Sequence, residues 1–432
     1  MKAKHLSRSV LAAVALCGSQ PSLAQFDYAL SGFGTVGYAT SNRPETYDRY
    51  INDRGTFMRD SVVGMQIDAK AFDDFGVTVQ VKGAPATNKD SRYEVSVPWA
   101  FVSWRPINDS LLRFGKQRIP YYLFSESFDV GASYDFARLP IEMYSLAPSN
   151  DLVGVSFQHT WHLQDTELTL DGLYGRSNND FRQWARDPIP GVQNPGAQFL
   201  RLTFKGGGLV LTYKHEDRLL RLGVLRATIS PADHSQLPAD FPFVNVAPGT
   251  GYYQVSNAFP GPGVATSKSV TTTLFTLGAS VALLGQVTAI GEFARVVSKG
   301  TQLSPRGNRG YAALLRPIDR WTPYVHYAFL KSPHGQRDLY TAVNDNMVPP
   351  FIPGAAAINA SQRVGADQNI AFNQSSWAAG ASYSLTPTSK FKGEFLRTRV
   401  RSVSQLLDVA PGDTPRNKTI NTWSLSYSVV FQ

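Results

Sequence analysis

Large apolar residues recur at every second position in several stretches of this chain, and this period limits the fold more than any other feature. From Trp423 to Phe431 every second residue is large and apolar, and the residues between them are mostly serine. Segments 61–71 and 151–161 show the same period. Because successive side chains of a strand point to opposite faces, each segment is predicted to be a strand with one apolar and one polar face.

Alternation alone fits both a soluble β-sandwich and a membrane β-barrel, so a second feature has to distinguish these two folds. Mean hydropathy is −0.19, which is expected of a membrane barrel because lipid-facing apolar residues alternate with polar residues of the lumen. Aromatic residues make up 12% of the chain. Several stand at predicted strand ends, as in the interfacial girdles of barrels, namely Tyr38, Trp104, Trp161, Trp321, Trp377 and Trp423. The prediction is an all-β fold, a transmembrane antiparallel β-barrel.

The first 24 residues are typical of a secretory signal peptide. Three basic residues and no acid precede an apolar run from Val10 to Cys17, and small residues lead to Ala24. A retained anchor is the alternative, but the run is too short to span a bilayer. Lipidation at Cys17, the only cysteine, is disfavoured by the large side chain before it. We expect cleavage after Ala24 and one barrel domain over 25–432, without disulfides.

The lengths of the connections predict the number of strands. Bacterial barrels join their strands by short periplasmic turns and longer external loops in alternation. Seven short connections, most of them containing turn-forming residues, lie at 73–74, 106–109, 162–165, 215–218, 284–285, 316–319 and 386–389. Eight longer ones lie at 40–58, 83–96, 119–151, 175–207, 230–268, 298–309, 331–375 and 401–417. Together they join 16 strands.

One segment does not fit this scheme. Residues 198–204 also have the pattern of a strand, and the three glycines at 206–208 that of a turn. Counting this strand gives an odd number, which single-chain bacterial barrels avoid. We therefore place it within the fourth long loop, and 18 strands remain the alternative.

Three segments carry a resemblance to a known family: FDYALSGFGTVGY at 26–38, LLRFGKQRIPYYLFSESFDVGASYDFARLPIEMY at 111–144, and WSLSYSVVFQ at 423–432. With them the chain resembles the general bacterial porins, and more closely the family related to phosphate-selective porins. The resemblance implies a homotrimeric pore of the bacterial outer membrane whose third loop folds inwards as a constriction. The ending at Phe431, here followed by Gln432, is similar to the signal read by the barrel-assembly machinery.

Charged residues of the third long loop and of the facing wall are the predicted pore residues. The loop carries Glu126, Asp129, Asp135, Arg138 and Glu142. A Lys or Arg that faces lipid at mid-bilayer costs about 2–4 kcal/mol, so bases that alternate away from the apolar set are assigned to the pore wall. These are Lys70, Lys82, Arg113, Arg221, Lys390 and Lys392. Opposed charges across a neck would set ion preference, whereas charges at the rims would only be solvated.

The overall charge and two arginines outside the pore give two further expectations. Of the 42 Lys and Arg, three lie in the predicted signal peptide, and the remaining 39 exceed the 33 Asp and Glu, which favours anionic solutes. Arg226 and Arg397 fall on lipid-facing positions near the external strand ends, where snorkelling to the interface or pairing with the phosphates of lipopolysaccharide would satisfy them.

No residue pattern predicts a catalytic, metal or cofactor site. Gly32, Gly34 and Gly37 match the dinucleotide-binding spacing, but no amphipathic helix follows them. His159 and His162 would lie on opposite faces of a strand, without further ligands. We predict a porin for passive diffusion of small hydrophilic solutes, with no enzymatic activity, cofactor or nucleic-acid partner. The alternatives are a structural or adhesive barrel with a plugged lumen, and an outer-membrane esterase.

Overall fold

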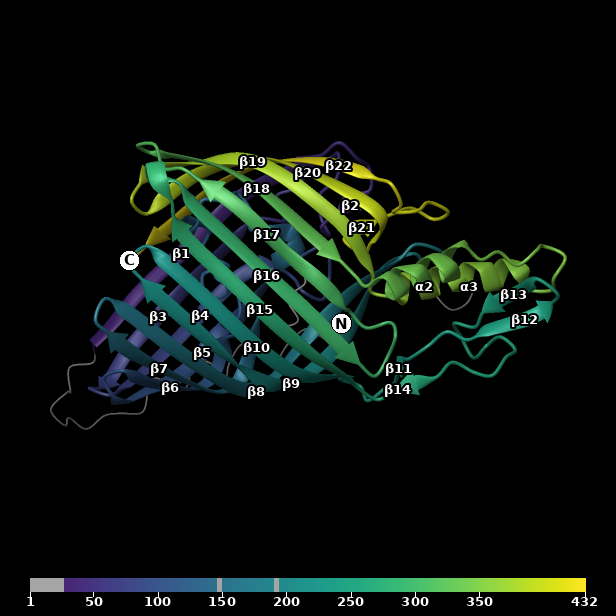
Figure 1. The fold of residues 1–432 in the computed structure, drawn as a ribbon, viewed down its shortest axis with the longest axis horizontal. Coiled ribbons are helices and arrows are strands. Elements are labelled where there is room, and N and C mark those ends of the chain that lie inside the picture. Colours follow the sequence, from purple (N-terminus) through teal and green to yellow (C-terminus); the bar gives the residue numbers. More distant parts are fainter. Residues whose placement is uncertain (1–26, 146–149, 190–193) are drawn as a thin grey trace, which may run out of the picture.

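The computed structural model describes residues 27–145, 150–189 and 194–432, and the predicted signal peptide lies outside them. These residues form one closed barrel of 16 antiparallel strands, shown in Figure 1, which confirms the predicted fold class and the strand count. The strands are β1 (Asp27–Ser41), β3 (Val62–Phe72), β4 (Phe75–Pro85), β5 (Tyr93–Ile107), β6 (Ser110–Arg118), β7 (Asp151–Leu163), β8 (Thr166–Ala185), β9 (Gly196–His215), β10 (Arg218–Pro231), β15 (Val270–Ala282), β16 (Thr288–Lys299), β17 (Gly307–Leu315), β18 (Trp321–Lys331), β19 (Phe372–Thr386), β20 (Ser389–Ser404) and β22 (Thr419–Phe431).

All seven predicted turns join neighbouring strands at one end of the barrel, and the other connections between neighbouring strands leave the barrel wall at the opposite end. The loops carry small elements of their own (Figure 1). These are β2 (Thr46–Tyr47), η1 (Gly131–Ser133), α1 (Ile141–Tyr144), β11 (Leu237–Pro238), β12 (Phe243–Ala247), β13 (Thr250–Tyr253), β14 (Thr266–Ser267), α2 (His334–Asp345), α3 (Ala355–Gln368) and β21 (Leu407–Asp408), while η2 (Leu284–Gln286) lies in a turn. Helices α2 and α3, with β12 and β13, project beyond the loop end.

The placement of 198–204 in the fourth loop was wrong. These residues belong to β9, which pairs with β8 without interruption from Gly196 opposite Ala185 to His215 opposite Thr166. The glycines at 206–208 lie in the middle of this strand and form no turn. The reason is steric: a Cβ atom on Gly207 would lie 2.0 Å from the carbonyl oxygen of Leu173. These glycines allow the neighbouring backbones to approach closely.

Replacing Gly207 by alanine is expected to disturb the pairing of β8 and β9 and to destabilise the barrel by about 1–3 kcal/mol, as overpacking does. The measurement is the urea midpoint of the folded band in heat-modifiable gel mobility. Gly172→Ala is the matched control, because a Cβ on Gly172 meets only a side-chain atom, that of Leu209 at 3.4 Å. Equal midpoints for the two variants would contradict the steric explanation.

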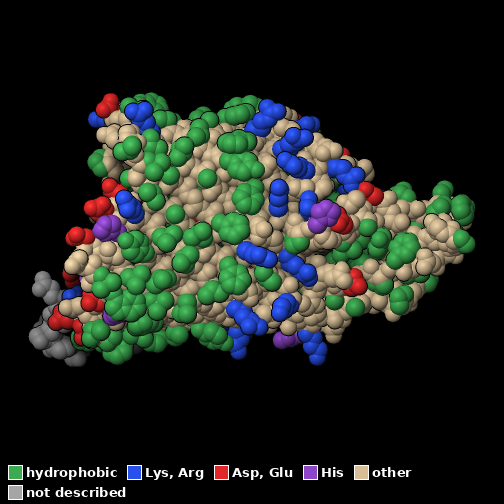
Figure 2. Space-filling model, viewed as in Figure 1, with side chains coloured by type: hydrophobic (Ala, Val, Ile, Leu, Met, Phe, Trp, Pro, Cys, Tyr) green, Lys and Arg blue, Asp and Glu red, His purple; other side chains and the backbone are tan. Residues whose placement is uncertain are grey.

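The outer face of the barrel is apolar around its middle (Figure 2). Val63, Met65 and Ile67 of β3 are each about half exposed. Such a row of exposed apolar side chains would be unfavourable in water. Figure 2 also shows Lys and Arg gathered near the loop end and Asp and Glu near the turn end. Among the predicted aromatic residues of the strand ends, Trp104, Trp161 and Trp321 are exposed next to turns. Within the described residues, no helix is long and apolar enough to cross a membrane.

Candidate functional site

The described part of the third loop between β6 and β7, residues 119–145, lies inside the barrel. Its residue Phe136 is fully buried, with its ring centroid 5.1 Å from that of Tyr324 and 6.2 Å from that of Tyr311. Tyr324 belongs to β18, which stands opposite β6 in the ring of strands. The backbone N–H of Ala137 donates to the Tyr324 hydroxyl at 2.8 Å. The loop therefore crosses the lumen and contacts the far wall.

A second contact with the far wall centres on Glu292 of β16. One carboxylate oxygen accepts a hydrogen bond from the backbone N–H of Leu123 at 2.9 Å. The other oxygen accepts from the hydroxyls of Tyr144 and Tyr311. Leu123 and Tyr144 come from the two ends of the third loop, so one buried carboxylate holds both ends against the wall.

The predicted loop acids Asp129 and Asp135 are paired with bases of the wall. Lys82 Nζ lies 3.0 Å from the Asp129 carboxylate, which also pairs with Arg118. These two bases hold the pKa of Asp129 below its usual value despite the burial of the carboxyl. Lys390 Nζ lies 2.7 Å from Asp135 Oδ1. The opposite charges are thus in direct contact and neutralise each other locally.

Arg138 and Glu142 are buried in the same loop. Arg138 Nε donates to Asp60 Oδ1 at 2.7 Å, and its Nη2 bonds Asp60 Oδ2 and Ser424. The guanidinium holds the pKa of Asp60 below its usual value. The Glu142 carboxylate accepts from Gln374 Nε2 at 2.8 Å and from a serine of β19, but its burial raises its pKa.

The remaining wall residues divide into two groups. Lys392 and Arg221 hold the backbone of the third loop: Lys392 Nζ donates to the Phe136 carbonyl at 3.0 Å, and Arg221 Nη1 to the Tyr122 carbonyl at 2.8 Å. The other group is Arg113 and Lys70, which contact residues outside the loop. Arg113 lies over the Phe101 ring at 5.6 Å, and Lys70 pairs at 3.4 Å with Asp73 of the first turn. Glu126 is an exposed acid of the third loop.

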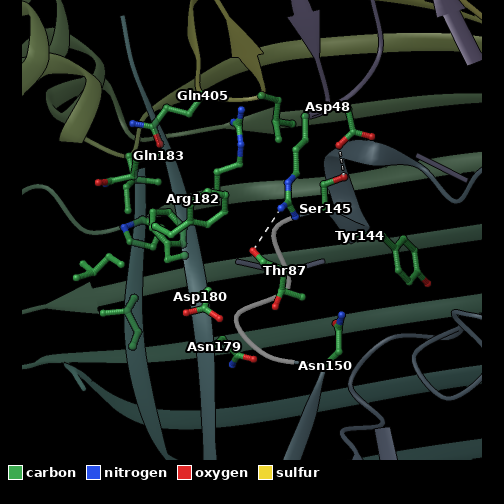
Figure 3. A pocket seen from close by; sticks show the side chains of 18 of the residues that line it. Asp48, Thr87, Tyr144, Ser145, Asn150, Asn179, Asp180, Arg182, Gln183 and Gln405 are labelled. Atoms are coloured by element: carbon green, nitrogen blue, oxygen red, sulfur yellow. Dashed lines mark hydrogen bonds between the residues drawn. The ribbon is translucent and has the colours of Figure 1, made fainter. Parts of the chain in front are cut away.

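A cavity of about 920 Å³ lies between the third loop and the outer loops. Its lining contains eight basic and five acidic residues, which are Arg49, Arg59, Lys82, Arg138, Arg182, Arg306, Arg309 and Lys392 with Asp48, Asp60, Asp129, Asp180 and Asp367. Figure 3 shows part of this lining, with Arg182, Gln183 and Asp180 on the β8 side and Asp48 bonded to Ser145 at 3.1 Å. The lining of this open cavity therefore carries more basic than acidic residues.

Sequence reasoning missed several of these residues. Asp60 and Arg118 were not candidates, because no local pattern shows that the first loop or the end of β6 meets the third loop. Arg309 could have been found, since it alternates away from the lipid-facing Leu314 of the same strand. Among the described residues, no group of three or more His, Cys, Asp or Glu could hold a metal ion.

No family model matches the chain, and no curated protein is similar to it in sequence. Among solved structures, in-vitro folded OmpT, an outer membrane protein of Vibrio cholerae, superposes with a TM-score of 0.51 at 10% identity, covering 94% of this chain and 97% of that one. Its trimer form gives 0.50 at 10% identity, covering 94% and 99%. An anion-selective porin from Comamonas acidovorans gives 0.47 at 11% identity, covering 94% and 100%. At such identities the OmpT structures show a shared fold alone.

Proposed function

We propose that the chain is an outer-membrane porin, a passive channel for small hydrophilic solutes with a preference for anions, and not an enzyme. The observation that carries the proposal is the cavity of about 920 Å³ inside a closed barrel whose outer face is apolar. A barrel closes every backbone hydrogen bond between its strands, so it can stand in lipid while its lumen holds water. An outer-membrane location follows from the same proposal.

The anion preference rests on the charges of the cavity. Eight bases against five acids leave a positive potential over the wider part of the lumen, where low-dielectric walls concentrate the field. The closer relation to phosphate-selective porins remains a prediction.

The predicted partners belong to the same proposal. A homotrimer would use apolar outer strands, and the trimer form of OmpT supports this arrangement; the native mass in detergent tests it. Phe431 fits over Gly32 where β22 closes on β1, so the predicted assembly signal is also the seam of the barrel, and the yield of folded F431A tests that role.

Lipopolysaccharide would meet a basic belt on the outer face near the loop end. Arg226 and Arg397 both belong to it, as predicted from the sequence, together with Arg176, Lys205, Arg295, Arg399 and Arg401; all seven are exposed. None of them makes an ion pair with a carboxylate among the described residues. Lipid phosphates are suitable partners for such a belt, and loss of lipopolysaccharide from purified R397Q/R399Q/R401Q would test the proposal.

The test of the channel is single-channel conductance with a salt-gradient reversal potential, measured on purified protein in a planar bilayer. We expect ohmic steps and a reversal potential on the chloride side, because the cavity is net basic. A potassium-side potential would contradict the anion preference. The third loop crosses the lumen, which favours the plugged or adhesive barrel as second candidate; a silent bilayer from folded protein would support it. Labelling by a serine-directed fluorophosphonate would instead favour the esterase.

A further inference from the structure

Three basic residues surround one glycine on the outer face of the barrel, near its loop end. Arg176 of β8 stands directly opposite Lys205 of β9 in the register of the sheet. Two positions further along β9, Gly207 stands between Arg226 of β10 and Tyr174 of β8. Neighbouring strands are about 4.8 Å apart and successive residues rise by about 3.3 Å, so the Cα atoms of all three bases lie within about 9 Å of this glycine. Because glycine has no side chain, the bases surround an open position on the sheet.

This basic cluster of Arg176, Lys205 and Arg226 has no carboxylate partner. All three side chains are exposed, and none of them makes an ion pair among the described residues. Like charges directly opposite each other on two strands destabilise a sheet, as Arg176 and Lys205 do here. A bound anion over the open position would remove this repulsion.

Hydroxyl groups and a further base extend the basic cluster around the barrel. Thr228 of β10 stands opposite Lys205, and Thr271 of β15 stands opposite Thr228. Lys299 of β16 follows opposite Thr271 and is exposed. From Arg176 to Lys299 the row crosses four strand spacings, or about 19 Å. Hydroxyls and basic groups are the donors from which phosphate oxygens accept, and this row contains no carboxylate that would repel them.

The apolar surface next to this row indicates that the anion belongs to a lipid. Leu209, Val224 and Phe275 stand side by side on the same outer face, and all three are exposed. They lie four positions nearer to the turns than Lys205, Thr228 and Thr271, a distance of about 13 Å along the strands. A headgroup phosphate over Gly207 would therefore place its acyl chains against apolar side chains. A free anion would use only the polar part of this surface.

We propose that the basic cluster binds the phosphomonoester group of a lipid headgroup in preference to a phosphodiester. A phosphomonoester carries a charge of about −1.5 to −2 near neutral pH, as phosphoserine does, and it has three terminal oxygens. A phosphodiester carries a single charge and has two terminal oxygens. Only the monoester can give each of the three bases its own oxygen. This inference rests on the proposed outer-membrane function and deepens it, since it assigns one site in the basic belt and one class of lipid to it.

The experiment measures lipid binding to the purified protein in detergent by native mass spectrometry. Phosphatidic acid is the monoester, and phosphatidylglycerol with the same acyl chains is the diester, so only the phosphate differs in class. At about pH 8, where a phosphomonoester is fully ionised, we expect a Kd about tenfold lower for phosphatidic acid. Inorganic phosphate is the third probe. It should not displace phosphatidic acid at equal concentration, because it has no acyl chains to bury; displacement at equal concentration would overturn the assignment to a lipid.

Two double variants with the same change of charge assign the preference to residues. Arg176→Gln with Lys205→Gln should bring the two Kd values within about twofold of each other, because one base is left for either lipid. Arg316→Gln with Arg320→Gln removes two exposed bases at the turn end and should keep the preference. Heat-modifiable gel mobility shows that both variants are folded before their lipid binding is compared.

The outcomes separate this inference from the proposed function. Equal Kd values of wild type for the two lipids would overturn the site, and so would an unchanged preference in R176Q/K205Q. Chloride conductance is measured independently, so neither result would affect the channel. Wild-type protein that retains lipopolysaccharide without preferring phosphatidic acid would keep the basic belt and overturn this site. A silent bilayer from protein that still prefers phosphatidic acid would overturn the channel and support the site.

Discussion

Replacing Arg138 by methionine should free the third loop from the barrel wall and raise the single-channel conductance. The side chains of Arg138 and Asp60 are only 6% and 10% exposed, and they form a bidentate ion pair. Removing one partner leaves the other charge buried without compensation, which costs about 3–5 kcal/mol. The part of the loop around residue 138 is then held less firmly against the wall, and the lumen widens there. Single-channel conductance and the urea midpoint of the folded band measure the two effects.

Two further variants make this prediction specific. The double variant Asp60→Asn with Arg138→Met should recover much of the lost stability, because no unpaired charge remains. Arg138→Lys keeps the charge but loses the bidentate geometry, so it should fall between wild type and R138M. An R138M barrel with wild-type conductance and wild-type midpoint would show that the pair does not anchor the loop.

Replacing Glu142 by glutamine should stabilise the third loop at neutral pH and reduce the pH dependence of stability that the wild type shows. Burial raises the pKa of Glu142 above its ordinary value of 4.5, so the folded state holds this proton to higher pH than the unfolded state does. The resulting stabilisation is complete below pH 4.5 and is lost as the pH rises through the raised pKa. A pKa that is higher by one in the folded state corresponds to about 1.4 kcal/mol of stability. Glutamine keeps the neutral shape and the acceptor for Gln374 at every pH.

The measurement is the urea midpoint of the folded band between pH 4.5 and 8. Wild type should lose more stability across this window than E142Q, because Asp367 and Asp408, whose pKa values burial also raises, still titrate in the variant. Asp60 and Asp129 do not interfere with this measurement. Their pKa values are lowered from the ordinary 3.8, so the stability that they contribute is lost only at a pH below this window. Glu126→Gln, an exposed acid of the same loop, is the control and should follow wild type. Lower stability of E142Q than of wild type at pH 7 would mean that the site prefers the ionised carboxylate.

Local pattern in the sequence was enough to predict the barrel, its 16 strands and all seven turns. Alternation is a property of neighbouring residues, and tight turns are short, so both can be read along the chain. Lys82, Arg221 and Lys392, which the same pattern assigned to the pore wall, contact residues of the third loop. It failed at 206–208, because glycine is typical of turns and also of places where two backbones come close.

Only the tertiary structure decided which charges meet. Asp60 and Arg138 are 78 positions apart, and Asp135 and Lys390 are 255 apart. Whether such residues pair depends on how a loop crosses the lumen and on which strand stands opposite, and no local period records that. The inward position of Phe204, Ile229 and Val270, which line the cavity, was hidden for the same reason, because an apolar residue facing the lumen looks in the sequence like one facing lipid. The alternation of apolar and polar residues determines that the sheet has two different faces. The closure of the sheet into a barrel decides what each face contacts.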